Sequence, residues 1–223
     1  MPTAEQYYTE IAKLRNNVYV AGKKVDRHDH MFEKSMSVIR RTFNAVDDPE
    51  LQPLVVAQSE VDGSEINRFT NTHGSIQDLL NEQEMTRKLC WKSGNCIQRC
   101  IGTDALTAVG VVSRKIDEAK VTEYHKNFLK FLKHFLENDP VGNAGQTDIK
   151  VNGSKRSHEQ KDPSPYLRMV EKRSDGIAVR GAKAHNTTGP YAEKIKVLPR
   201  RALTNEEGII GRSPSPFQGT RNG

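Results

Sequence analysis

The sequence predicts a mainly α protein with a partial β domain. Up to about residue 143, apolar side chains recur every three or four positions, which is typical of helices that bury one face. After Gly142 this periodicity stops, and small and polar residues dominate as far as Pro165. We therefore expect three parts: an N-terminal helical domain over 1–143, the beginning of an incomplete β domain over 144–203, and an irregular tail over 204–223.

The helical part divides into five predicted helices. Thr3 and Gln6 have the spacing of a capping box, so the first helix begins there and continues for about four turns. The remaining helices are expected over roughly 30–46, 75–91, 95–119 and 124–138. Two short apolar segments, at 54–56 and 66–69, are separated by Asp62-Gly63-Ser64 and form a candidate hairpin.

The β part begins with a strong hairpin signal. Asp175-Gly176 lies between two alternating segments, 167–172 and 176–181, and a further strand is expected at 195–198. Three strands are too few to close a sheet and bury both of its faces. We therefore expect a truncated chain, and a complete small protein with a flexible tail is the alternative.

Composition limits the partners and the compartment. The chain has 223 residues, 34 Lys and Arg against 28 Asp and Glu, a net charge of +6 and a mean hydropathy of −0.71. The basic residues are spread along the chain, with a few pairs and no stripe that alternates with stacking aromatics, so nucleic-acid binding is not expected, while a coenzyme A or flavin phosphate suits the charge. The N-terminus does not resemble a signal peptide, no apolar run could span a membrane, and three cysteines are too few for a disulfide scaffold. We expect a cytoplasmic protein.

Cys96 and Cys100 are the most informative residues. Four positions apart on a helix, two side chains lie on one face about a turn from each other. Two thiolates in this arrangement can hold a soft metal or two corners of an iron–sulfur cluster. The alternative is a pair of buried cysteines that only pack, and we interpret Cys90 in that way because it faces elsewhere on a helix.

Two histidine-containing segments are weaker candidates. His28-Asp29-His30 precedes a predicted helix, where an N-cap aspartate and solvated histidines are more typical than a metal site. His185-Asn186-Thr187-Thr188 follows a predicted strand, where its side chains could contact a ligand or could satisfy the backbone of a turn.

Several segments together resemble the 4-hydroxyphenylacetate 3-hydroxylase family of flavoproteins, and more closely its 4-hydroxybutyryl-CoA dehydratase branch. The segments that carry the resemblance occur in order at 67–70, 96–105, 124–128, 137–139, 162–163 and 167–185, and the match extends to about Glu207. The Cys-x3-Cys spacing of Cys96 and Cys100 separates the dehydratase branch from the aromatic hydroxylases.

The resemblance implies an acyl-CoA-dehydrogenase-like architecture with a helical N-terminal domain, a β middle domain and a C-terminal helical bundle. The dehydratases carry FAD and a [4Fe-4S] cluster held by three cysteines and one histidine. They convert 4-hydroxybutyryl-CoA to crotonyl-CoA, many also isomerise vinylacetyl-CoA, and they are usually homotetramers.

Carried over to this chain, the resemblance implies that Cys96 and Cys100 are the first two cluster ligands. It also implies that Gln98 lines the same site as a catalytic residue, and that the Thr187 hydroxyl approaches flavin N5. The third cysteine and the histidine ligand belong to the C-terminal bundle, so we expect the lone chain to be inactive.

A flavin-contacting loop is implied at Thr147, Asp148 and Lys150. The sequence departs from the family pattern directly afterwards, because Val151-Asn152-Gly153 stands where Gly-Asp-Arg is expected. Losing that glycine and that cation predicts weaker flavin binding.

Three functions remain open. The first is the N-terminal part of a 4-hydroxybutyryl-CoA dehydratase and vinylacetyl-CoA isomerase. The second is a component of a flavin-dependent aromatic monooxygenase, which the cysteine pair disfavours. The third is a non-enzymatic helical fragment or a subunit of a split enzyme.

Overall fold

The computed structural model describes residues 1–223 except 95, 98, 150, 163, 199–216 and 220–223. Six α-helices are present in the described part: α1 (Ala4–Lys13), α2 (Glu33–Asn44), α3 (Gln52–Val55), α4 (Ile76–Ser93), α5 (Cys100–Lys120) and α6 (Tyr124–Asn138). The strands are β1 (Val18–Val20), β2 (Lys23–Val25), β3 (Val56–Gln58), β4 (Glu65–Asn67), β5 (Gly142–Gly145), β6 (Arg168–Lys172), β7 (Ile177–Arg180), β8 (Lys194–Val197) and β9 (Phe217–Gly219).

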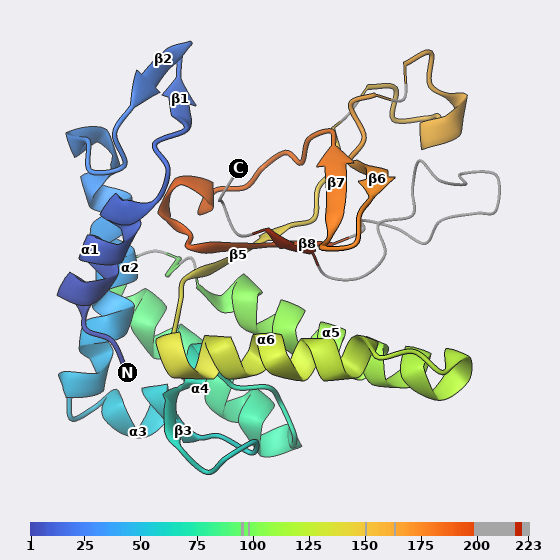
Figure 1. Cartoon of the computed structure of the whole chain (residues 1–223). Helices are drawn as coiled ribbons and strands as arrows, with labels where there is room; N and C mark the ends of the chain where they lie inside the picture. The colour runs from blue at the N-terminus through green and yellow to red at the C-terminus, as the bar shows by residue number, and fades with distance from the viewer. Residues whose placement is uncertain (95, 98, 150, 163, 199–216, 220–223) are drawn as a thin grey trace.

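The strands form small, separate sheets. β1 pairs with β2, β3 with β4, and β6 with β7, in each case antiparallel. β5 lies parallel to β8, and β9 pairs antiparallel with the other edge of β8. Figure 1 shows β5 and β8 above the paired helices α5 and α6, and β5 contacts α5.

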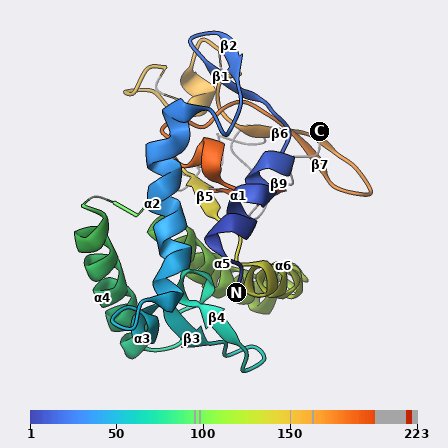
Figure 2. The ribbon, with the colours of Figure 1, turned by 90° about the vertical axis from the view of Figure 1, so that its left-hand side faces the viewer.

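Three apolar clusters hold the elements together. The first joins α1 and α2 to the segment after α6, the second joins α3 to α4, and the third lies between α5 and α6. In Figure 2, α2 runs upright between α1 and α4, and it contacts both helices. The first cluster includes Val141 and Tyr191, so the N-terminal helices and the β part share a core.

Several local predictions are confirmed. Thr3 and Gln6 form the capping box of α1, and α6 has the predicted bounds. The predicted helix over 30–46 is α2 with a short 3₁₀ turn at each end. The Asp175-Gly176 hairpin is β6–β7, and the further strand is β8.

Other predictions are wrong. The helix predicted from residue 95 begins only at Cys100. Gly94, with a left-handed φ of 70°, ends α4, and a link separates the two helices. On α4 the apolar residues at the start are exposed, with Ile76 at 78% and Leu80 at 51%, and the buried apolar residues are Met85 and Leu89 further along the helix.

Three strand pairings, β3–β4, β1–β2 and β8–β9, lie where the sequence has weak turn or strand signals. The candidate hairpin at 54–69 is the β3–β4 pair, with bounds shifted by two residues at its start. The β1–β2 hairpin was not predicted, because its turn is Ala21-Gly22 rather than a typical Asn-Gly or Asp-Gly. The tail contributes β9, which was also not predicted.

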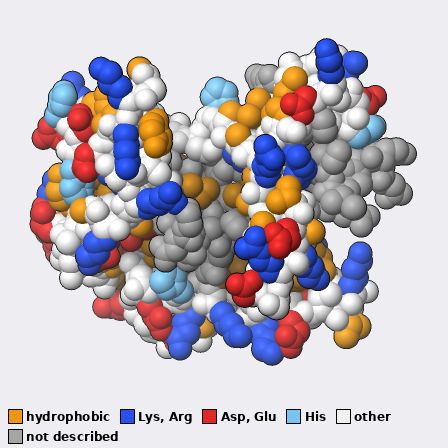
Figure 3. Space-filling model, turned by 45° about the horizontal axis from the view of Figure 1, so that its top comes forward, with side chains coloured by type: hydrophobic (Ala, Val, Ile, Leu, Met, Phe, Trp, Pro, Cys, Tyr) orange, Lys and Arg blue, Asp and Glu red, His pale blue; other side chains and the backbone are white. Residues whose placement is uncertain are grey.

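The surface is mixed in charge. On the face drawn in Figure 3, Lys and Arg side chains are interspersed with Asp and Glu. None of the helices in the described part of the chain is long and apolar enough to cross a membrane.

Candidate functional site

The two cysteines lie at the N-terminal end of α5 but do not share a helical face. Cys100 is the first residue of the helix and is half-buried, whereas Cys96 precedes the helix in the link from α4 and is exposed. Ile97, between them, is fully buried in the second apolar cluster. The predicted arrangement on one helix is therefore wrong.

Arg99, directly before Cys100, fixes this segment to the interior. Its side chain is 2% exposed and lies 2.5 Å from Asp139 Oδ1 at the end of α6. Nη1 donates to Thr42 Oγ1 at 3.1 Å, and the guanidinium lies over the rings of Phe43 and Phe69. Burial raises the pKa of Asp139, and Arg99 opposes that rise. The sequence did not indicate this role, since nothing local distinguishes Arg99 from a surface arginine.

Lys196 connects β8 to the first turn of α5. Its Nζ donates to the carbonyl oxygen of Gly102 at 2.6 Å and lies 4.4 Å from the centre of the Phe135 ring. Burial, and secondly the charge of Arg99, lower the pKa of Lys196 to about 7. The start of the cysteine-bearing helix is thus held by two buried basic side chains, Arg99 and Lys196.

The residues predicted to contact flavin form a second group. Asp148 pairs with Lys183 at 2.5 Å, and the Ala184 amide donates to the Thr147 carbonyl at 2.8 Å. The structure therefore brings the Thr147 loop against the segment that leads to Thr187, which is exposed. Gln98 and Lys150, predicted as a catalytic and a flavin-binding residue, lie outside the described residues.

Strand β5 connects the two groups. At its start Gly142 lies against Gly102, so close that a Cβ added to Gly102 would be 3.2 Å from the Gly142 carbonyl oxygen. At its end a Cβ added to Gly145 would be 3.5 Å from Asn186 Oδ1. A strand of this length spans about 10 Å. The cysteine segment and the predicted flavin loops therefore lie at opposite ends of one short strand.

Two sequence interpretations outside this region are confirmed. Asp29 accepts a hydrogen bond from the Met31 amide and caps the turn before α2, while the ring of His28 stacks on Tyr8 with 3.9 Å between ring centres. These residues line a hollow of about 250 Å³. Cys90 packs against the second apolar cluster, as predicted.

Comparison with known proteins gives relatives of two kinds. The chain is 40% identical over 207 residues to a 4-hydroxybutyryl-CoA dehydratase/vinylacetyl-CoA-Delta-isomerase of Clostridium aminobutyricum, covering 92% of this chain and 42% of that protein. It is 24% identical over 216 residues to a 4-hydroxyphenylacetate 3-monooxygenase oxygenase component of Geobacillus sp. (strain PA-9), again covering 92% and 42%. The chain thus spans about two fifths of the length of these relatives.

Solved structures agree with this grouping. An oxygen-tolerant archaeal 4-hydroxybutyryl-CoA dehydratase from N. maritimus matches with a TM-score of 0.89 and 32% identity, over 94% of this chain and 42% of that chain. The oxygenase component of 4-hydroxyphenylacetate 3-monooxygenase in complex with FAD matches with a TM-score of 0.75 at 17% identity, over 94% and 43%, and therefore shows a shared fold. The family described as 4-hydroxyphenylacetate 3-hydroxylase N terminal matches residues 3–208, and the chain belongs to this family.

Proposed function

We propose that this chain forms the N-terminal part of an enzyme that dehydrates 4-hydroxybutyryl-CoA and isomerises vinylacetyl-CoA, with FAD and a [4Fe-4S] cluster as cofactors. The observation that carries the proposal is the 40% identity to a relative of that name, against 24% to the monooxygenase component. An acyl-CoA thioester is the substrate class. We extend the proposal to domain boundaries at 143 and 203, a homotetramer and a cytoplasmic location.

The cysteine segment fits an iron–sulfur cluster by the chemistry of its donors. Thiolates are the usual protein ligands of such clusters, and Cys96 and Cys100 would supply two of the four ligands required. The positive end of the α5 dipole favours a cluster that carries negative charge. Arg99 would act through Cys100 as a positioning residue, because its buried pair with Asp139 fixes the backbone between the thiols. We place Gln98 beside the cluster.

The second group of residues would hold the flavin. Thr147, Asp148 and Lys150 follow β5 in the chain, and Thr187 lies in the segment whose Ala184 amide donates to the Thr147 carbonyl. Hydroxyl, carboxylate and ammonium groups of this kind orient a flavin through its ring and phosphate atoms. When bound, the flavin supplies one-electron chemistry and the cluster iron supplies a Lewis acid for the leaving hydroxyl.

Reconstitution with a complementary segment tests the proposal. The chain is produced without oxygen together with the part of the Clostridium aminobutyricum relative that the alignment does not cover, with iron, sulfide and FAD. We expect visible cluster and flavin absorption and formation of crotonyl-CoA from 4-hydroxybutyryl-CoA. Cys96→Ser and Cys100→Ser should each abolish the cluster absorption, whereas Cys90→Ser serves as the matched control and should retain it.

Two outcomes would contradict parts of the proposal. A stable [4Fe-4S] cluster on the chain alone would show that cluster binding does not need ligands from another segment. Hydroxylation of 4-hydroxyphenylacetate that is unaffected by Cys96→Ser and Cys100→Ser would favour the aromatic monooxygenase. The oxygenase component of such an enzyme shares the fold of this chain at 17% identity.

A further inference from the structure

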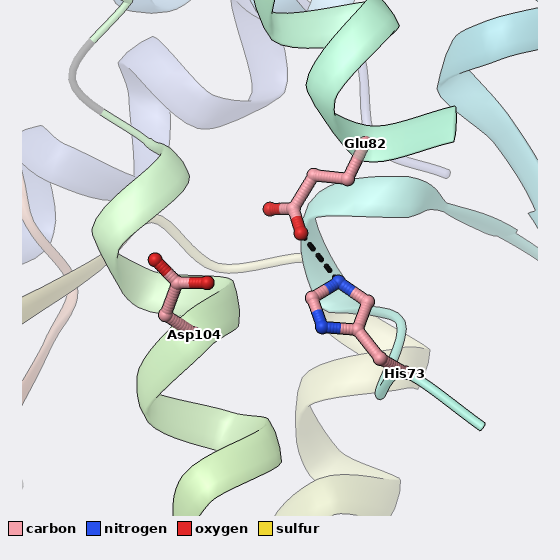
Figure 4. Close-up of side chains that lie close together, drawn as sticks. All are labelled: His73, Glu82 and Asp104. Atoms are coloured by element: carbon pink, nitrogen blue, oxygen red, sulfur yellow. Dashed lines mark ion pairs between the residues drawn. The ribbon is translucent and has the colours of Figure 1, made fainter. Parts of the chain in front are cut away.

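A cluster of three side chains that could each bind a metal ion lies about one turn beyond Cys100. His73 precedes α4, Glu82 lies on α4 and Asp104 lies on α5, and Figure 4 shows the three side chains directed toward one another. One ligand atom from each lies within 4.8 Å of the others. The side chains of His73 and Glu82 are 6% and 10% exposed, while Asp104 is exposed. The cluster is therefore buried on two sides and open to solvent on the third.

The imidazole of His73 is held with Nε2 directed at the cluster. Thr107 Oγ1, on α5, accepts a hydrogen bond from the His73 backbone amide at 3.2 Å and lies 3.4 Å from its Nδ1. If Nδ1 carries the proton and donates to Thr107, the lone pair of Nε2 faces Glu82. A hydrogen bond of this kind from the distal nitrogen orients most histidines that bind metals.

Nε2 of His73 is buried and lies directly against the Glu82 carboxylate. A second carboxylate, from Asp104, faces the same space. Burial raises the pKa of Glu82, the charge of Asp104 raises it further, and His73 opposes the rise. Two carboxylates thus face one imidazole in a partly desolvated position.

The nearest arginine does not neutralise this cluster directly. Arg68 donates through Nε to the Leu54 carbonyl at 2.5 Å and through Nη2 to the Val56 carbonyl at 3.2 Å. Its Nη1 lies 3.9 Å from Asp78 Oδ1, so its closest carboxylate is Asp78 rather than Glu82. The charge of Arg68 is shared with another acid, and the cluster is left with an excess of negative charge.

We propose that His73, Glu82 and Asp104 bind a divalent first-row transition-metal ion. One imidazole nitrogen with two carboxylate oxygens suits Mn²⁺, Fe²⁺ or Zn²⁺, and water would complete the coordination on the exposed side at Asp104. The ion links the middle of α4 to the first turns of α5. It is separate from the proposed cluster site, because its donors are nitrogen and oxygen and include no thiolate.

Titration with Mn²⁺, followed by loss of the electron paramagnetic resonance signal of the free ion, tests the site on the full chain. Mn²⁺ is chosen because it prefers oxygen and nitrogen donors, so the cysteines should not contribute. We expect saturation at one ion per chain and displacement of Mn²⁺ by Zn²⁺, which binds such donor sets more tightly. Saturation above one ion per chain, or no binding, would overturn the proposal.

Variants locate the ion. Asp104→Asn changes an exposed side chain and should weaken Mn²⁺ binding at least about tenfold without loss of folding, and Thr107→Val should weaken it about tenfold by releasing the histidine. Glu118→Gln removes an exposed carboxylate from the same helix and is the matched control. Equal weakening by Glu118→Gln, or no weakening by Asp104→Asn, would show nonspecific attraction to surface charge.

Discussion

Arg99 and Asp139 form a buried ion pair, with Nη2 and Oδ1 2.5 Å apart and each side chain 2% exposed. The pair joins the residue between the two cysteines to the C-terminal end of α6, because Asp139 caps that helix. The position of the cysteine segment therefore depends on Asp139, which follows Arg99 by 40 residues. The guanidinium also lies over the rings of Phe43 and Phe69, which further limits its movement.

Breaking this pair should destabilise the whole chain. We expect Arg99→Met to lower the free energy of unfolding by about 3–5 kcal/mol, because it leaves the Asp139 carboxylate buried and uncompensated. Urea denaturation measures the effect. Arg87→Met, which removes an exposed arginine paired with Glu84, is the control and should leave stability almost unchanged. Equal effects of the two substitutions would contradict the structural role of Arg99.

Lys196 should make stability depend on pH. Its pKa is lowered to about 7 in the folded chain, so above that pH the folded state is largely neutral at this residue while the unfolded state stays protonated. The unfolded state then binds more protons, and the free energy of unfolding should rise between about pH 7 and pH 10 by up to about 1.4 kcal/mol per pH unit. Below pH 7 both states are protonated, and this contribution to the slope disappears.

Urea denaturation across this pH range separates Lys196 from other titrating groups. Lys196→Met should remove that part of the rise, whereas Lys120→Met, at an exposed position on α5, should retain it. The same pH dependence in the wild-type chain and Lys196→Met would show that the buried ammonium is not responsible.

Local signals in the sequence predicted the elements whose stability is local. The α1 capping box, the bounds of α6 and the β6–β7 hairpin each depend on residues a few positions apart, and each is confirmed. The repeat of apolar residues predicted a start for α5 that is too early, because such a repeat does not show that Gly94 takes a left-handed conformation. For the same reason, it did not show that Cys96 lies outside the helix.

Contacts between distant residues could not be predicted in this way. Lys196 reaches Gly102 across 94 positions, and a lysine between two β-branched residues has the alternating pattern of an exposed strand position. His73 lies close to Glu82 and Asp104 only because the fold brings the starts of α4 and α5 together. The identities of the cysteines pointed to metal chemistry, but the buried groups that hold them became visible only in the fold.

The N-terminal cap of α4 should contribute measurably to stability. Ser75 Oγ accepts from the Asp78 amide at 3.2 Å, and Asp78 Oδ2 accepts from the Ser75 amide at 3.0 Å. Ser75→Ala should lower the free energy of unfolding by about 1 kcal/mol, because it removes the acceptor for an unpaired helix amide. Ser93→Ala removes the same hydroxyl at the other end of α4, where no N-cap is lost. A larger effect of Ser93→Ala in urea denaturation would contradict this account.

Gly181 should accept a side chain only at a cost in stability. It follows β7 with a φ of 128°, and an added Cβ would lie 2.4 Å from the Tyr166 carbonyl oxygen and 2.5 Å from the Leu167 Cα. Gly181→Ala must therefore displace the backbone before β6 or distort its own, at a cost on the order of 1–3 kcal/mol. Urea denaturation measures this cost.

Gly176, at the other end of β7, is the matched control for Gly181, because an added Cβ there meets no atom within 4 Å. We expect Gly176→Ala to change stability by less than about 0.5 kcal/mol. Gly181→Ala should also shift the amide resonances of Ala184 and Thr187, because the strained position leads directly into their segment and Ala184 is hydrogen-bonded to Thr147. If Gly181→Ala were as stable as Gly176→Ala and left these resonances in place, the close approach of the backbones would not position the proposed flavin-binding segment.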